Sequence, residues 1–309
     1  MTLLKRLIDF YINSSIHVAL AVLSFCFLTA IELDLKLSVY FYISVFCASV
    51  SGYNFVKYFG LAKFYYRALT NKLKYIQLVS LINIIGFLYS FSFLQTQSQL
   101  LLFFLGLITF LYAIPLGIKT PINLRSIGGI KIYVIAIVWA GTSVFLPLLE
   151  TRSVLFLDHL WIIFQRILLL IVLMLPFEIR DLESDEAYLS TIPQQVGIHK
   201  TKLIGYTLLI DIFILEILKH KTNRESALVL FFTIAVLAVL LFMSTKGRSR
   251  YFTSLIVESV PIIALIFFAL FIIITWVPFS ISIQFLICLI GKTWSSVPWI
   301  WIIFFKVLL

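Results

Sequence analysis

The 309-residue sequence is poor in charged residues, which make up only 12% of it, whereas hydrophobic residues make up 62%. A soluble globule of this size needs more polar surface than such a composition provides, so a soluble protein is excluded. Lipid offers the backbone no hydrogen-bond partners, and therefore only helices or a closed barrel can span it. The apolar runs are continuous and do not alternate, which predicts an all-α, polytopic membrane protein.

Cysteine is also scarce. Cys26, Cys47 and Cys288 stand in apolar surroundings without ligand-like spacing, which argues against a disulfide framework or a cysteine metal site. Acidic residues number 14 against 24 Lys and Arg, a net charge of +10, which cytoplasmic loops facing anionic headgroups explain without nucleic-acid binding. No small-residue cleavage site follows the first apolar run, so we expect a retained first helix.

Long apolar stretches recur along the chain and are long enough to cross a bilayer, which takes about 20 residues. We predict about nine transmembrane helices in a single domain over residues 1–309. A hydrophobic tail over 281–309 is compatible with a tenth span, a re-entrant piece or an interfacial helix. The nine predicted spans lie near 14–31, 37–53, 76–95, 98–116, 129–149, 155–177, 201–218, 227–243 and 253–276.

The distribution of Lys and Arg over the loops predicts the orientation. With a cytoplasmic N-terminus, 16 of them fall on the cytoplasmic side and 5 on the opposite side, before the tail is counted. The positive-inside rule therefore places the N-terminus and the long basic loops in the cytoplasm. The expected location is the bacterial inner (plasma) membrane.

Three carboxylates converge at the cytoplasmic end of the sixth predicted span. Glu178, Asp181 and Asp185 are spaced i, i+3 and i+7, which brings them within an arc of about 60° on one helical face. Like charges so close repel one another, and a divalent cation relieves the repulsion. Oxygen ligands of this kind suit Mg²⁺, which commonly bridges carboxylates to phosphates. A solvated acidic helix end is the alternative.

The stretch from Glu178 to Asp185, followed by Ser190-Thr-Ile-Pro193 and Gly197, resembles the second aspartate-rich motif of the UbiA superfamily of intramembrane prenyltransferases. That motif reads D-x-x-D-x-x-x-D, so Glu178 stands where Asp is usual. The number of spans, the long loop after the second and the basic loop after the fourth extend the resemblance over most of the chain. A ninth span with Glu258 near its start agrees with it.

The resemblance implies a helical bundle around a central cavity, and transfer of an isoprenoid group from a polyprenyl diphosphate to a lipophilic acceptor. It implies Mg²⁺ as cofactor, with Asp181 and Asp185 as ligands and Glu178 as a third or outer-shell ligand. Diphosphate contacts are expected from basic residues of the cytoplasmic loops, namely Lys119, Arg125, Lys131 and Lys200.

The first aspartate-rich motif of that family, N-D-x-x-D-x-x-x-D, is degenerate here. Asn54 is retained, but Phe55, Tyr58 and Ala62 occupy the aspartate positions. The segment instead carries the basic residues Lys57, Lys63 and Arg67, which we expect to contact the substrate together with Asn54. One hypothesis is that Lys57 replaces one metal ion and the surviving carboxylates hold a single Mg²⁺. The alternative is a catalytically impaired relative that binds an isoprenoid or lipid.

Polar residues inside the predicted spans suggest buried contacts, because charge in hydrocarbon costs about 2.5–3.5 kcal/mol on insertion scales. We expect Arg166 to pair with Asp211 or Glu216 as a structural bridge, and Glu258 to face the interior. Such charges also occur in transporters, which remain a third alternative.

Overall fold

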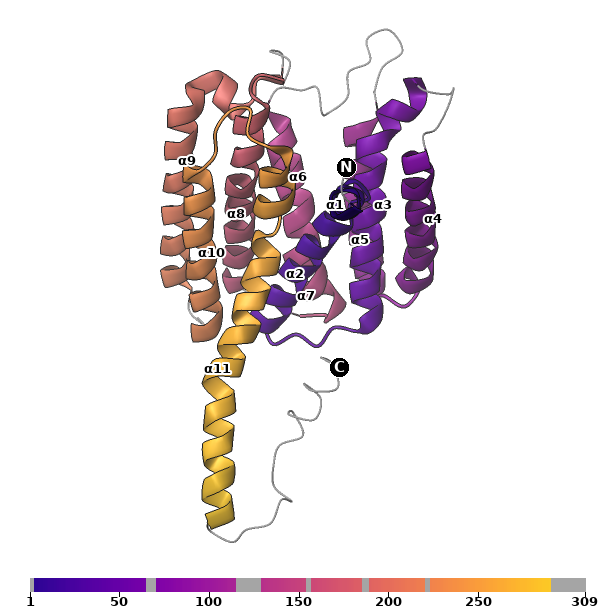
Figure 1. Cartoon of the computed structure of the whole chain (residues 1–309). Helices are drawn as coiled ribbons and strands as arrows, with labels where there is room; N and C mark the ends of the chain where they lie inside the picture. Colours follow the sequence, from indigo (N-terminus) through magenta and orange to yellow (C-terminus); the bar gives the residue numbers. More distant parts are fainter. Residues whose placement is uncertain are drawn as a thin grey trace. The chain divides into compact units, whose positions relative to one another are not determined.

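The computed structural model describes the backbone of residues 3–64, 71–114, 129–153, 157–184, 189–219 and 223–289, with side chains except for 60–64, 71–72 and 275–289. Every regular element in these ranges is a helix, which confirms the predicted all-α class. In chain order they are α1 (Leu3–Asn13), α2 (Ile16–Glu32), α3 (Val39–Phe64), α4 (Asn71–Phe91), α5 (Thr96–Ala113), α6 (Ile130–Ala140), the π-helical η2 (Gly141–Phe145), α7 (Leu146–Glu150), α8 (Leu157–Asp181), α9 (Ile192–Leu218), α10 (Arg224–Phe242), the π-helical η4 (Phe252–Val257) and α11 (Val260–Leu289) (Figure 1).

Seven helical segments are long and apolar enough to span a bilayer, and α1 with α2 forms an eighth candidate bent by 58°. The chain is therefore an integral, multi-pass membrane protein, but the predicted count of nine is not confirmed. The difference lies in α9, which covers the predicted span 201–218. Lys202, Asp211 and Glu216 place three charged residues in this stretch, which is not among the segments apolar enough to span.

The chain divides into two compact units, Met1–Leu265 and Ile266–Leu309. In the first unit, α3, α4 and α5 pack together, as do α8, α9 and α10, and α6 contacts both α5 and α8 (Figure 1). The most buried span is that of α8, 61% against 11% for α4, because apolar side chains surround it on most sides. The described part of the second unit is the continuation of α11, which runs beyond the predicted end at 276 to Leu289.

The helix α3 is longer than predicted. The sequence predicts a loop over residues 54–62 after the second span, and that prediction is wrong, because α3 continues to Phe64. With Phe55, Tyr58 and Ala62 in place of three aspartates, no run of charge or proline ends the helix earlier. The residues that align with the first family motif therefore lie on a helix.

The break between α1 and α2 is held by side chains of α3. Ser15 has a positive φ of 61° at the bend. The Lys57 ammonium donates a hydrogen bond to the Ile12 carbonyl (3.1 Å), and the Tyr58 hydroxyl donates one to the Asn13 carbonyl (2.9 Å). The last carbonyls of a helix have no partner within it, so these two residues cap the end of α1.

Candidate functional site

A cavity of about 590 Å³ lies among α2, α3, α4, α5, α6 and η2. Its wall is largely apolar, and small residues leave it open: a Cβ added at Gly106 would meet nothing within 4 Å. Two lysines, Lys57 and Lys131, are the charged residues of its lining. Lys57 belongs to the last third of α3 and Lys131 to the first turn of α6. An apolar cavity with cations in its wall suits an amphiphile with an anionic head.

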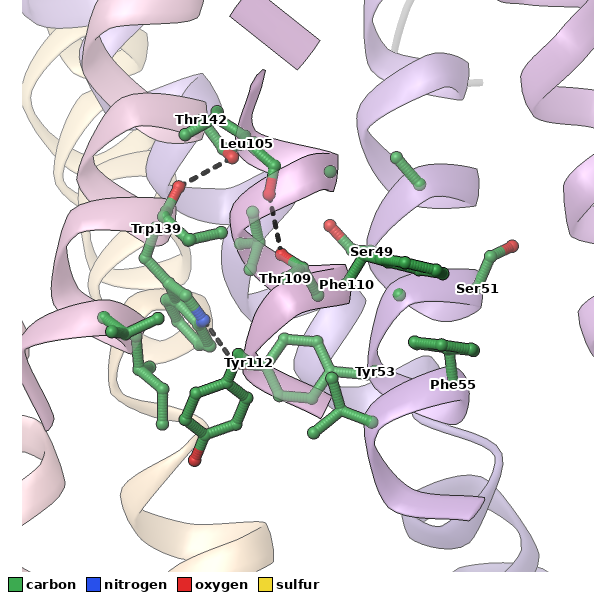
Figure 2. Close-up of a pocket in the computed structure, with 18 of the residues that line it drawn as sticks. Ser49, Ser51, Tyr53, Phe55, Leu105, Thr109, Phe110, Tyr112, Trp139 and Thr142 are labelled. Carbon is green, nitrogen blue, oxygen red and sulfur yellow. Dashed lines mark hydrogen bonds between the residues drawn. The ribbon is translucent and has the colours of Figure 1, made fainter. Parts of the chain in front are cut away.

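Aromatic side chains form much of the cavity wall. Figure 2 shows Tyr53, Tyr112 and Trp139 close together, and the Trp139 indole nitrogen donates a hydrogen bond to the Tyr53 hydroxyl. Phe55 and Phe110 stack across α3 and α5, with ring centroids 5.7 Å apart and planes 6° from parallel. Such π-faces attract cations, including one that develops on a bound ligand.

A cluster of ionisable side chains lies beside Lys57 in the first unit. Glu258, directly after η4, interacts electrostatically with both Lys57 and Arg180, and it is partly buried, as expected for a residue facing the interior. His17 accompanies them: its Nδ1 lies 2.9 Å from the Tyr11 hydroxyl, and its Nε2 lies 3.0 Å from the Leu255 carbonyl oxygen. Charged and polar groups of α1, α2, α3, α8 and η4 therefore converge at this end of the bundle.

Glu178 and Asp181 lie in the last turn of α8, as predicted. Glu178 is only 1% exposed, and its Oε2 accepts a hydrogen bond from the Ile192 backbone N–H (3.2 Å). Asp181 lies nearer the surface and forms a bidentate ion pair with Arg180 (2.6 and 2.7 Å). Arg180 also donates to the Thr253 hydroxyl, so it links α8 to η4. Both described carboxylates have protein partners.

The loop after α8 is tied to its surroundings. The Gly247 N–H donates to the Arg180 carbonyl (3.3 Å), and the Gly129 N–H donates to the Leu189 carbonyl (2.9 Å). Gly129 has a φ of +74°, a backbone conformation that glycine adopts without steric cost. The start of α6, which carries Lys131, is thereby held next to Leu189, shortly before α9.

The other predicted site residues do not line the cavity, or their side chains are not described by the structure. The Asn54 amide donates to the Ser80 hydroxyl of α4 (2.9 Å) and is buried, and Lys200 is exposed near the start of α9. Within the described ranges, no group of three or more His, Cys, Asp or Glu side chains is placed to hold a metal ion. Five predicted residues lie outside the described side chains: Lys63, Arg67, Lys119, Arg125 and Asp185.

The predicted bridge from Arg166 to Asp211 or Glu216 is wrong. The Arg166 guanidinium lies 4.2 Å from the centroid of the Phe25 ring and donates to the Thr29 hydroxyl (3.2 Å). Glu216 pairs instead with Lys219 (2.6 Å), which also binds Glu32 (2.8 Å). The cation that pairs with Glu216 is Lys219, three residues later at the end of the same helix. Lys219 lies just outside the predicted span 201–218, so the polar residues within the spans do not indicate this pair.

Several residues that line the cavity were not predicted from the sequence. Tyr53, Trp139, Thr109 and Thr142 line it, yet each reads in the sequence as one more residue of an apolar span. The one local signal is Gly141, which begins the π-helical turn η2 beside the cavity. Turns of this kind occur frequently at functional sites.

No model of a known protein family matches the sequence, and no curated protein matches it. Two solved structures do match the fold. The apo structure of a UbiA homologue from Aeropyrum pernix K1 has a TM-score of 0.59 at 13% identity, and a UbiA homologue from Archaeoglobus fulgidus bound to GPP and Mg²⁺ has a TM-score of 0.55 at 11% identity. Each match covers 84% of this chain and 98% of the other. The similarity concerns the fold.

Proposed function

Since the chain has the fold of the UbiA superfamily, we propose that it is a membrane prenyltransferase that moves an isoprenoid group from a polyprenyl diphosphate to a lipophilic acceptor. The observation that carries the proposal is the apolar, aromatic cavity with Lys57 and Lys131 in its wall. An isoprenoid diphosphate has the matching chemistry, an apolar chain with an anionic head. The solved relative from Archaeoglobus fulgidus holds such a ligand.

In this proposal the two lysines bind the diphosphate and the aromatic wall binds the chain. Each ammonium supplies fixed positive charge to the leaving group in a site of low dielectric constant, where charge interactions are strong. As the bond between the allylic carbon and the diphosphate oxygen breaks, the electron pair leaves with the diphosphate. The π-faces of Tyr53 and Trp139 stabilise the positive charge that develops on carbon. A nucleophilic atom of the acceptor then attacks that carbon.

We propose Asp181 and Asp185 as the residues that hold Mg²⁺, with Glu178 outside the first shell. The donor chemistry fits, because carboxylate oxygens are preferred ligands of this ion. Asp181 has 24% of its side chain exposed and can exchange Arg180 for a cation, whereas buried Glu178 is held by the Ile192 N–H. A bound Mg²⁺ would neutralise charge on the leaving diphosphate. With no carboxylate in the degenerate first motif, one ion in place of two is expected, and Lys57 supplies the missing charge.

The basic residues of the predicted cytoplasmic loops belong to the same proposal. By their charge they would attract an anionic ligand to the cytoplasmic side; they are Lys63, Arg67, Lys119, Arg125 and Lys200. The positive-inside bias supports a cytoplasmic position for this end and for the N-terminus, in a bacterial inner membrane.

A second candidate is an isoprenoid-binding protein without turnover. It is favoured by the pairing of the described carboxylates, since Asp181 is bound to Arg180 and Glu178 to the backbone of Ile192. The first motif also lacks every aspartate. Such a protein would bind the diphosphate through Lys57 and Lys131 without dependence on Mg²⁺.

The test is binding of geranylgeranyl diphosphate to the purified full chain in detergent, with and without Mg²⁺. The enzyme proposal expects Mg²⁺-dependent binding that is weakened in Asp181→Ala and Asp185→Ala. Loss of one charge-assisted contact in Lys57→Met or Lys131→Met should weaken binding by about tenfold to a hundredfold. Lys36→Met, an exposed lysine before α3, is the matched control.

Release of diphosphate on addition of a lipid extract as the source of acceptor would then show turnover. Binding that ignores Mg²⁺ and both aspartates, without release of diphosphate, supports the second candidate. Binding that neither lysine variant alters contradicts both candidates, because both place the anionic head at Lys57 and Lys131.

A further inference from the structure

An acidic side chain faces outward from the C-terminal half of α9. Beyond the kink at Gly197, α9 continues to Leu218 over about 30 Å, which matches the thickness of the hydrocarbon core. Asp211 lies about 10 Å from the Leu218 end and is exposed. Among the described residues it has no ion-pair partner within 4.0 Å. In the span that the sequence predicts over 201–218, lipid tails would surround its carboxylate.

This position differs from that of Glu216, the other acidic residue of α9. Glu216, five residues later, is buried and bound to Lys219 and to the Gln165 amide (3.0 Å). Ionisable residues within membrane spans almost always face a partner, because exposure to hydrocarbon is unfavourable. The inner side of α9 packs on α8 and α10, whereas Asp211 is exposed and accessible to a partner from outside the bundle.

The exposed face of α9 carries a regular repeat. Large apolar side chains that are 47% to 65% exposed lie there, and together with the exposed Thr207 they are spaced alternately by four and three residues. That spacing averages 3.5 residues, the repeat with which two helices pack along a left-handed seam. The seam consists of Leu203, Thr207, Ile210, Ile214 and Ile217.

We propose that this face of α9 binds α9 of a second copy of the chain, in a two-fold symmetric dimer within the membrane. Two copies inserted with the same orientation bring Asp211 of both to the same depth, and a two-fold axis makes the seam its own complement. In a parallel pair, a residue beside the seam faces one five positions later on the partner helix. For Tyr206 that residue is Asp211 of the second copy.

Tyr206 supplies the donor that Asp211 lacks. It flanks the seam on the side opposite Asp211, and it is partly exposed. Its phenol O–H can donate to the carboxylate of the second copy, and symmetry makes two such bonds in each dimer. Polar contacts of this type stabilise the association of membrane helices. The apolar residues of α4 are exposed too, but its outward face offers no carboxylate that needs a partner.

Cysteine cross-linking tests the contact directly. In full-length protein with Cys26, Cys47 and Cys288 replaced by alanine, Ile210→Cys is expected to form a disulfide between copies in lipid vesicles, because this position lies in the seam. Ile85→Cys, 61% exposed on α4, is the matched control and should remain monomeric. Equal cross-linking at both positions, or none at Ile210→Cys, would overturn the proposal.

The hydrogen bond is tested by measuring the dimerisation constant from energy transfer between labelled copies at several protein-to-lipid ratios. Tyr206→Phe and Asp211→Leu should each weaken association about tenfold to a hundredfold, since each removes both symmetric bonds. The double variant should lose no more than either single variant, and Asp211→Asn, which keeps an acceptor, should stay close to the original protein. A protein that is monomeric at every ratio, or single losses that add up, would refute the pairing.

Discussion

Lys219 holds together a buried ion network, and its removal gives the sharpest prediction about stability. The Lys219 side chain is 3% exposed and lies 2.6 Å from Glu216 and 2.8 Å from Glu32, whose side chains are 5% and 19% exposed. In Lys219→Met, the buried Glu216 carboxylate loses its cation and retains the hydrogen bond that the Gln165 amide donates to it. Removing one partner of a buried ion pair costs about 3–5 kcal/mol, and most of that loss comes from Glu216 because Glu32 is nearer to water.

The measurement is the free energy of unfolding from denaturant titrations in mixed micelles, followed by tryptophan fluorescence. The double variant Lys219→Met with Glu216→Gln should recover most of the loss, since no unpaired charge then remains buried. Lys36→Met is the control, because Lys36 is exposed. Two results would contradict this prediction. One is a free energy of unfolding of Lys219→Met within about 1 kcal/mol of that of the original protein, and the other is a double variant that is no more stable than the single one.

Three further predictions follow from positions described by the structure. Gly205→Val should lower the free energy of unfolding by about 1–3 kcal/mol, because an added Cβ lies 2.4 Å from a methyl group of Leu241, whereas Gly106→Ala should not; thermal unfolding in detergent compares the two. Gly106→Leu should fill part of the cavity and therefore weaken binding of the longer geranylgeranyl diphosphate more than that of geranyl diphosphate. Competition assays compare the two, and equal weakening would contradict binding of the isoprenoid chain at Gly106. The hydrogen bond that Tyr251 donates to Asp9 raises the pKa of the tyrosine above its ordinary value of 10, so this contact is intact below pH 10 and is lost as the pH rises through the higher folded-state value. A fluorophore on α1 should report that step, and in Tyr251→Phe the step should be absent.

Much of the fold can be predicted from this sequence because the bilayer imposes a strong pattern. Apolar runs of the right length identify most spans, and the predicted span that is not confirmed, 201–218 in α9, is the one that three charges interrupt. The spacing of Glu178 and Asp181 correctly places them in the last turn of one helix. The continuation of α3 through residues 54–62 was missed, because the family motif suggested a loop while the replaced aspartates had removed the reason for one.

The candidate site is harder to predict, because it depends on contacts between distant segments. Lys57 and Lys131 were predicted as site residues from their positive charge, and both line the cavity. Charge alone does not predict the partners of Arg166, Glu216 and Asp181. Arg166 lies over an aromatic ring, Glu216 binds Lys219 three residues later, and Asp181 binds its neighbour Arg180. Such pairings depend on side-chain direction, which one-dimensional spacing does not supply.

The hydrogen bond from Lys57 to the Ile12 carbonyl has a consequence for how the protein can be studied. An ammonium group has three N–H donors, and the end of α1 uses one of them. Its positive charge also interacts with Glu258, and the ammonium lies in the wall of the cavity, where it can attract an anion. A single nitrogen atom thus joins the N-terminal helix to the wall of the cavity, so a label placed on α1 is expected to report whether the cavity is filled.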